Sequence, residues 1–130
     1  MLTAELLAPA ALWGYLGAVA EYLGVGIESV TVDLDPPASA YVALDGGAPG
    51  HMDGELALLW DERHGWAAAV ETGAGDEVNV LGYLGGVHAV ADPAEVKRFV
   101  DAVRSGWRPT MRPPEFAPTN DLDEYLTRET

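Results

Sequence analysis

Five polar residues near the first predicted strands are of the types that bind metal ions: Asp33, Asp35, His51, Asp53 and Glu55. Asp33 and Asp35 are two positions apart in an alternating stretch, so their side chains share one face of a strand. Carboxylates and imidazoles bind zinc and hard cations, which makes the set a candidate metal site. However, no HExxH motif or EF-hand loop accompanies it, and Asp-Pro-Pro is ordinary turn chemistry. We therefore favour a solvated strand face and expect no cofactor.

A second candidate lies between two tryptophans, in the charged segment DERH at residues 61–64. These side chains include a general acid and a general base within a few residues. Hairpin loops favour the same polar types for solubility and turn geometry. The flanking Trp60 and Trp66 suit a cross-strand aromatic pair. We favour a hairpin tip that fixes strand register over an active site.

Other catalytic signatures are missing from the sequence. The chain has no cysteine, which excludes disulfides, thiolate nucleophiles and cysteine metal sites. No serine stands in a G-x-S-x-G elbow, and the glycine-rich stretches lack the spacing of phosphate and dinucleotide loops. Whether the protein is an enzyme stays uncertain, and we favour a non-enzymatic role.

The chain is strongly acidic, with seven Lys and Arg residues against 21 Asp and Glu, a formal net charge of −14. Such a charge repels nucleic-acid phosphates and anionic lipid head groups, so we expect no nucleic-acid and no membrane partner. The apolar N-terminus lacks a basic leader, and Glu5 and Glu21 interrupt it before the roughly 20 apolar residues that span a bilayer. We therefore expect a cytoplasmic protein.

Two helices are predicted at the ends of the domain. The first runs from Pro9 to Leu23, where leucine, valine and tyrosine recur at three- and four-residue spacing and Gly24 follows as a cap. The second begins after Asp92, with Pro93 in its first turn and Glu95 completing a capping box. Its buried stripe is Val96, Phe99, Val100 and Val103, and Gly106 ends it.

Between the helices, alternating apolar and polar residues predict five strands, near residues 29–35, 38–44, 56–60, 66–70 and 78–84. Residues 61–65 form a five-residue hairpin loop in which Gly65 takes a positive φ. The predicted fold is α+β, in the order α-β-β-β-β-β-α. It has a mainly antiparallel five-stranded sheet with both helices on one face. Residues 1–106 form this single domain.

Residues 107–130 form a proline-rich C-terminal tail with a possible short helix near its end. Its apolar anchors are Trp107, Met111, Phe116, Leu122, Tyr125 and Leu126. These side chains either dock on the chain's own sheet, swap onto a second copy, or bind another protein. They are the candidate partner-binding residues.

The segments VTVDLDPPASAYVALDG, LALLWDERHGWAAAVETG and VNVLGYLGG resemble a small family of uncharacterised actinobacterial proteins, a domain of unknown function. The resemblance covers roughly Leu12 to Val103 and leaves out the tail. It rests on the VDLDPP and LLWDE–HGWA motifs. It implies no activity.

We therefore predict a small acidic protein-interaction or regulatory module that binds a protein partner or forms a homodimer. One alternative is a metal-assisted or acid–base enzyme, which requires the acidic residues to meet in a concave pocket. The other is a binder of a small apolar ligand cupped between the sheet and a helix.

Overall fold

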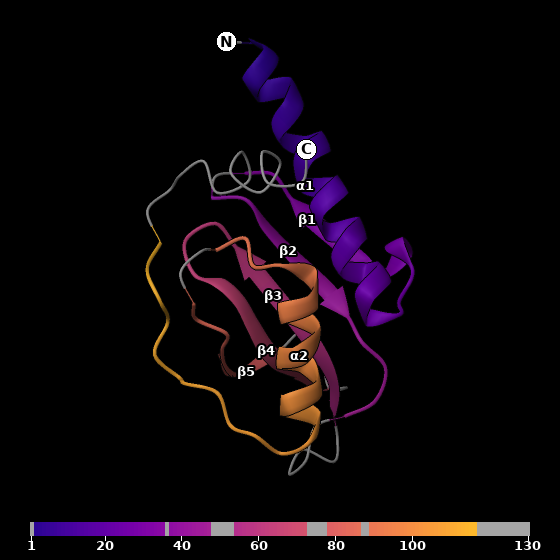
Figure 1. Cartoon of the computed structure of the whole chain (residues 1–130), viewed down its shortest axis with the longest axis vertical. Helices are drawn as coiled ribbons and strands as arrows, with labels where there is room; N and C mark the ends of the chain where they lie inside the picture. The colour runs from indigo at the N-terminus through magenta and orange to yellow at the C-terminus, as the bar shows by residue number, and fades with distance from the viewer. Residues whose placement is uncertain (1, 36, 48–53, 73–77, 87–88, 117–130) are drawn as a thin grey trace.

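A computed structural model describes residues 2–35, 37–47, 54–72, 78–86 and 89–116, with the side chains of residues 2–9 and 72 left aside. The elements in chain order are α1 (Leu2–Leu23), the 3-10 turn η1 (Ile27–Ser29), β1 (Val30–Asp33), β2 (Ser39–Ala43), β3 (Gly54–Asp61), β4 (Gly65–Thr72), β5 (Val78–Tyr83) and α2 (Pro93–Arg104). The five strands form one sheet in the order β1-β2-β3-β4-β5, with every neighbouring pair antiparallel. Both helices lie on the same side of this sheet (Figure 1). The predicted fold class is confirmed.

The N-terminal helix differs from the prediction at its start. It begins at Leu2, so Pro9 lies inside α1 instead of in its first turn. Leucine, alanine and glutamate in the first turns are strong helix formers, and they extend the helix past the hydrogen bond that the proline lacks. Gly24 follows with a φ of +75°, which confirms the left-handed cap. Within the described residues, no helix is long and apolar enough to cross a membrane.

The central hairpin joins β3 and β4 with Trp60 opposite Trp66. The two rings are 6.5 Å apart between centroids and tilted by 49°, and both face the helices in the core. This confirms the cross-strand pair. The connection is shorter than predicted, because Asp61 and Gly65 still pair and residues 62–64 alone form the turn. Gly65 has the expected positive φ, +69°.

Polar atoms of the core aromatics hold the segment that follows β5. The indole N–H of Trp66 donates to the Tyr15 hydroxyl at 2.9 Å, and this hydroxyl donates to the Ala91 carbonyl oxygen. The Trp60 indole donates to the Ala89 carbonyl oxygen, also at 2.9 Å. These bonds satisfy the polar ends of large buried rings and position the chain for α2.

Helix α2 starts as its sequence predicts, with Pro93 in its first turn and its four predicted apolar residues buried. The Asp92 carbonyl oxygen accepts the amides of Glu95 and Val96, at 2.9 and 3.0 Å. The Asp92 side chain makes no capping hydrogen bond, so the predicted capping box does not form. The Glu95 amide, which a capping side chain would accept, is bonded to the Asp92 backbone carbonyl oxygen instead.

Candidate functional site

Residues 107–116 run back along the free edge of β5, and we call them the strap. Tyr83 on β5 pairs with Thr110, whose carbonyl oxygen accepts the Tyr83 amide at 2.8 Å. At the hairpin tip, the Phe116 amide donates to the Arg63 carbonyl oxygen at 2.8 Å, and His64 Nδ1 donates to the Pro114 carbonyl oxygen at 2.9 Å. The described part of the tail therefore lies on its own domain.

A groove opens to solvent between α2, the start of the strap and the end of β5. Its volume is about 460 Å³, within the range of roughly 300–1,000 Å³ that ligand sites occupy. It is lined by Leu84, Glu95, Arg98, Phe99, Ala102, Ser105 and Trp107. The α2 residues among these have the spacing i, i+3, i+4 and i+7, so they form one side of the helix. This side shares Phe99 with the stripe that faces the core, and its Arg98 side chain is exposed to solvent.

Two aromatic rings contribute to the apolar surface of the groove, together with Leu84 and Ala102. Phe99 is buried, and its ring meets that of Trp107 edge to face, with 6.2 Å between centroids. Trp107 is 51% exposed, and Met111 further along the strap is 62% exposed. Large exposed apolar side chains next to a concavity are typical of protein-binding surfaces.

The basic residues of the chain are concentrated in the stretch of sequence that supplies most of the groove lining. The stretch from Lys97 to Arg112 holds five of the seven Lys and Arg residues and one acid, Asp101, a net charge of +4. The rest of the chain holds two basic and 20 acidic residues, a net charge of −18. Arg98 from this basic stretch lines the groove, and Arg108 follows directly after the lining residue Trp107, on an otherwise strongly negative chain.

The sequence-predicted anchors have different environments. Trp107 lines the groove and Met111 is exposed on the strap. Phe116 is half-buried at the hairpin tip, beside Gly65. The remaining anchors, Leu122, Tyr125 and Leu126, lie outside the described residues.

The candidate metal ligands are not brought together where the structure describes them. Asp33 lies at the end of β1 and pairs with Ser39, whereas Glu55 lies at the opposite end of the sheet, opposite Glu71. Asp33 accepts the Asp35 amide at 3.0 Å, as a turn requires. His51 and Asp53 lie outside the described residues. Among the described residues, no group of three or more His, Asp and Glu side chains is arranged to hold a metal ion.

The hairpin-tip side chains make structural hydrogen bonds. Asp61 Oδ1 accepts the amides of Arg63 and His64, both at 2.7 Å, which closes the turn. Glu62 Oε2 accepts the Ala38 amide at 3.3 Å, and the Glu62 amide donates to the Ala38 carbonyl oxygen at 3.1 Å. Together with the bonds to the strap, these contacts make the tip a junction between three segments of the chain.

A tyrosine crosses the sheet face that the helices leave open. Tyr41 on β2 donates to Glu71 Oε2 on β4, so its side chain must cross β3. Ala57 on β3 and Ala69 on β4 pair with each other between these two residues and are 1% and 0% exposed. Burial, the hydrogen bond to Glu71 and the charges of Glu71 and Glu55 raise the pKa of Tyr41 to about 12. Tyr41 is therefore protonated at neutral pH, and its hydroxyl links β2 to β4 through Glu71. We call this hydrogen bond the clasp.

The sequence interpretation named Trp107 but missed the helix side of the groove. Glu95, Arg98 and Ala102 are ordinary residues for the outer face of a helix, and Leu84 is an ordinary strand end. One signal was available in the sequence, which is the clustering of basic residues between Lys97 and Arg112.

Comparisons with known proteins agree with the resemblance noted above. Neither a curated protein nor a solved structure matches the chain significantly. The model of a family of unknown function, DUF6292, matches residues 15–102. This range includes the sheet, most of α2 and the C-terminal part of α1 from Tyr15 onward, whereas Ser105, Trp107 and the rest of the strap lie beyond it. Because the match covers more than half of its length, the chain belongs to this family of unknown function.

Proposed function

We propose that the protein is a non-enzymatic protein-interaction module of the cytoplasm, and that it binds its partner in the groove beside α2. The observation that carries this proposal is the half-exposed Trp107, held edge to face on buried Phe99 at the wall of an open concavity. Tryptophan is among the residues most enriched at the energetic centres of protein interfaces. The exposed half of the Trp107 ring is available to another molecule, while its other half packs on Phe99.

The position of the strap supports the same function. Its backbone is fixed at Thr110, Pro114 and Phe116, so Trp107 projects from a segment that is already held in place. A pre-organised anchor loses little conformational entropy on binding, which favours affinity. Deleting the chain from Trp107 onward would also uncover the edge of β5, so point variants are the cleaner test of binding.

The net negative charge of the chain limits the classes of partner that it can bind. The net charge of −14 disfavours nucleic acid and anionic membranes, so proteins are the macromolecular partners that it favours. A homodimer through the groove is one form of such an interaction, and it requires an acidic, apolar segment of the second copy.

Native mass spectrometry of the protein isolated gently from its own host tests this function. We expect a protein adduct of defined mass, either a partner or a second copy. A stoichiometric metal or small-molecule adduct on an otherwise monomeric chain would contradict the proposal. Such a result would instead favour the enzymatic or ligand-binding alternatives.

A further inference from the structure

We propose that the segment recognised in the groove is acidic, with carboxylates flanking one or two large apolar anchors. This inference rests on the proposed function and specifies the chemistry of the partner. It follows from which basic side chains lie in or next to the groove lining, and from which of them already have a bonding partner within the chain.

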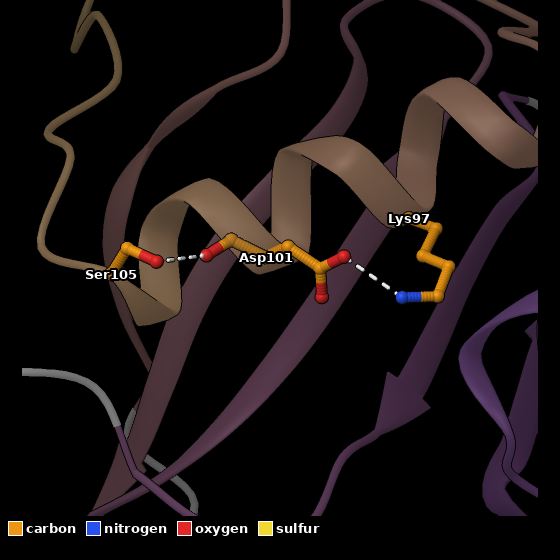
Figure 2. Close-up of polar contacts among 3 residues, drawn as sticks. All are labelled: Lys97, Asp101 and Ser105. Atoms are coloured by element: carbon orange, nitrogen blue, oxygen red, sulfur yellow. Dashed lines mark hydrogen bonds and ion pairs between the residues drawn. The ribbon is translucent and has the colours of Figure 1, made fainter.

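Two of the five clustered basic residues are occupied within the chain. Lys97 Nζ forms an ion pair with Asp101 Oδ2 at 2.8 Å, one turn along α2 (Figure 2). Ser105 donates from its hydroxyl to the Asp101 backbone carbonyl oxygen at 3.0 Å. Arg104 donates to the Asp45 carbonyl oxygen at 2.7 Å, beside the end of β2. The single acid of the basic stretch is therefore neutralised by Lys97.

The other three are available to a ligand. Arg98 lines the groove, and Arg108 and Arg112 lie on the strap beside Trp107 and Met111. All three are exposed, and within the described part of the chain their side chains form no ion pair. Arginine binds carboxylates through two parallel hydrogen bonds, which gives both attraction and geometric selectivity.

Glu95 is the one acid in the groove lining, and it lies in the first turn of α2. Its position near Gly86 places it at the end of the groove toward the N-terminus of the helix. An acidic segment is therefore expected to place its carboxylates toward Arg98 and the strap, and away from Glu95. This gives the bound segment a preferred direction.

The charge of the remaining surface adds selectivity. A basic segment would be attracted to most of a molecule whose other residues carry a net charge of −18. An acidic segment is disfavoured by the net charge of the rest of the chain, so its docking is favoured where Arg98, Arg108 and Arg112 are exposed. The apolar anchors then supply contact with Phe99, Trp107 and Leu84 that charge alone does not provide.

A selection from a random library of twelve-residue peptides, displayed on phage and panned against the full chain, tests this chemistry. Peptides that also bind the Trp107→Ala variant are discarded, because their binding does not depend on the groove. The matched control for loss of an exposed tryptophan is Trp13→Ala, because Trp13 is 40% exposed on α1. We expect the retained peptides to carry a net negative charge and at least one large apolar residue. Their dissociation constants should rise about tenfold in Arg98→Glu, which corresponds to the loss of one charge-assisted pair and the addition of a like charge.

Lys97→Glu is the charge-matched control, because it makes the same change one residue away, outside the groove lining. It should change the dissociation constants less than about twofold. Retained peptides that are neutral or basic, or that lose affinity equally in Lys97→Glu and Arg98→Glu, would overturn the acidic chemistry while leaving the groove as a binding site. A selection that yields no peptide dependent on Trp107 would overturn the proposed function itself.

Discussion

Phe99 and Trp107 meet edge to face, 6.2 Å apart between ring centroids, although Phe99 is 3% exposed and Trp107 is 51% exposed. The pair joins the core to the surface. The buried ring belongs to the apolar stripe of α2, and the exposed ring is the wall of the groove. This arrangement separates the residue that stabilises the fold from the residue that we expect to bind a partner.

Alanine substitutions should show this separation. Phe99→Ala leaves a cavity in the core, and we expect it to lower the free energy of unfolding by roughly 3–5 kcal/mol. Trp107→Ala removes about half a buried side chain and should cost roughly 1–2 kcal/mol. Urea denaturation followed by circular dichroism measures both. Equal losses would mean that Trp107 is chiefly a structural residue.

The Tyr15 hydroxyl is predicted to stabilise the core through its two hydrogen bonds. Tyr15→Phe leaves the Trp66 indole N–H and the Ala91 carbonyl oxygen without this partner. Unsatisfied buried polar groups cost about 1–3 kcal/mol, so we expect a loss of that size in urea denaturation. Tyr22→Phe on the same helix is the control, because Tyr22 is 51% exposed and should tolerate the change. An unaltered Tyr15→Phe protein would contradict the role of this hydroxyl.

The clasp between Tyr41 and Glu71 predicts a loss of stability at high pH. The pKa of Tyr41 is raised from 10.0 to about 12, so between these values the folded chain holds a proton that the unfolded chain releases. The stabilisation is complete below pH 10 and is lost as the pH rises toward 12. We expect a loss of roughly 1 kcal/mol, because solvent screens part of the shift.

The measurement is the free energy of unfolding from pH 9 to 12 for the wild-type chain and Tyr41→Phe. The advantage of the wild-type chain should shrink with rising pH, since only it can ionise at this position. Parallel profiles would show that the phenol is not held by Glu71.

Two glycines in α1 should be replaceable with a gain in stability. An added Cβ at Gly14 or Gly17 meets no atom within 4 Å, and both positions are helical. Alanine should therefore raise the free energy of unfolding by about 0.5–1 kcal/mol at each site. Gly24→Ala is the contrasting variant, because a φ of +75° strains any other residue and should lower stability. Thermal unfolding distinguishes these outcomes. A destabilised Gly14→Ala protein would show that an added methyl group at this position does meet other atoms, contrary to the open space around Gly14 in the structure.

Local sequence patterns predicted most of the fold. The alternation around Trp60 and Trp66 placed both strands and their pairing, because one buried face specifies the register. Pro93 marked the start of α2, because proline is favoured in the first turn of a helix. The start of α1 was missed because a proline ordinarily begins or breaks a helix, and its neighbours' preference for helix outweighed that rule here.

The groove was harder to predict. It exists because the strap returns along β5 and brings Trp107 against α2, which is a contact between segments that no local pattern encodes. The sequence identified Trp107 as an anchor only because it is a large apolar residue in a proline-rich tail. It gave no indication that Leu84 and Ala102 would face the same hollow.

The most direct test of the groove is to compare what the wild-type chain, Trp107→Ala and Trp13→Ala retain when each is purified from the native host. Quantitative mass spectrometry measures the amount of each co-purified protein per mole of chain. We expect a stoichiometric partner with the wild-type chain and with Trp13→Ala, and its loss, by about tenfold or more, with Trp107→Ala. Retention of the same partner by a folded Trp107→Ala protein would contradict the assignment of the groove as the binding site.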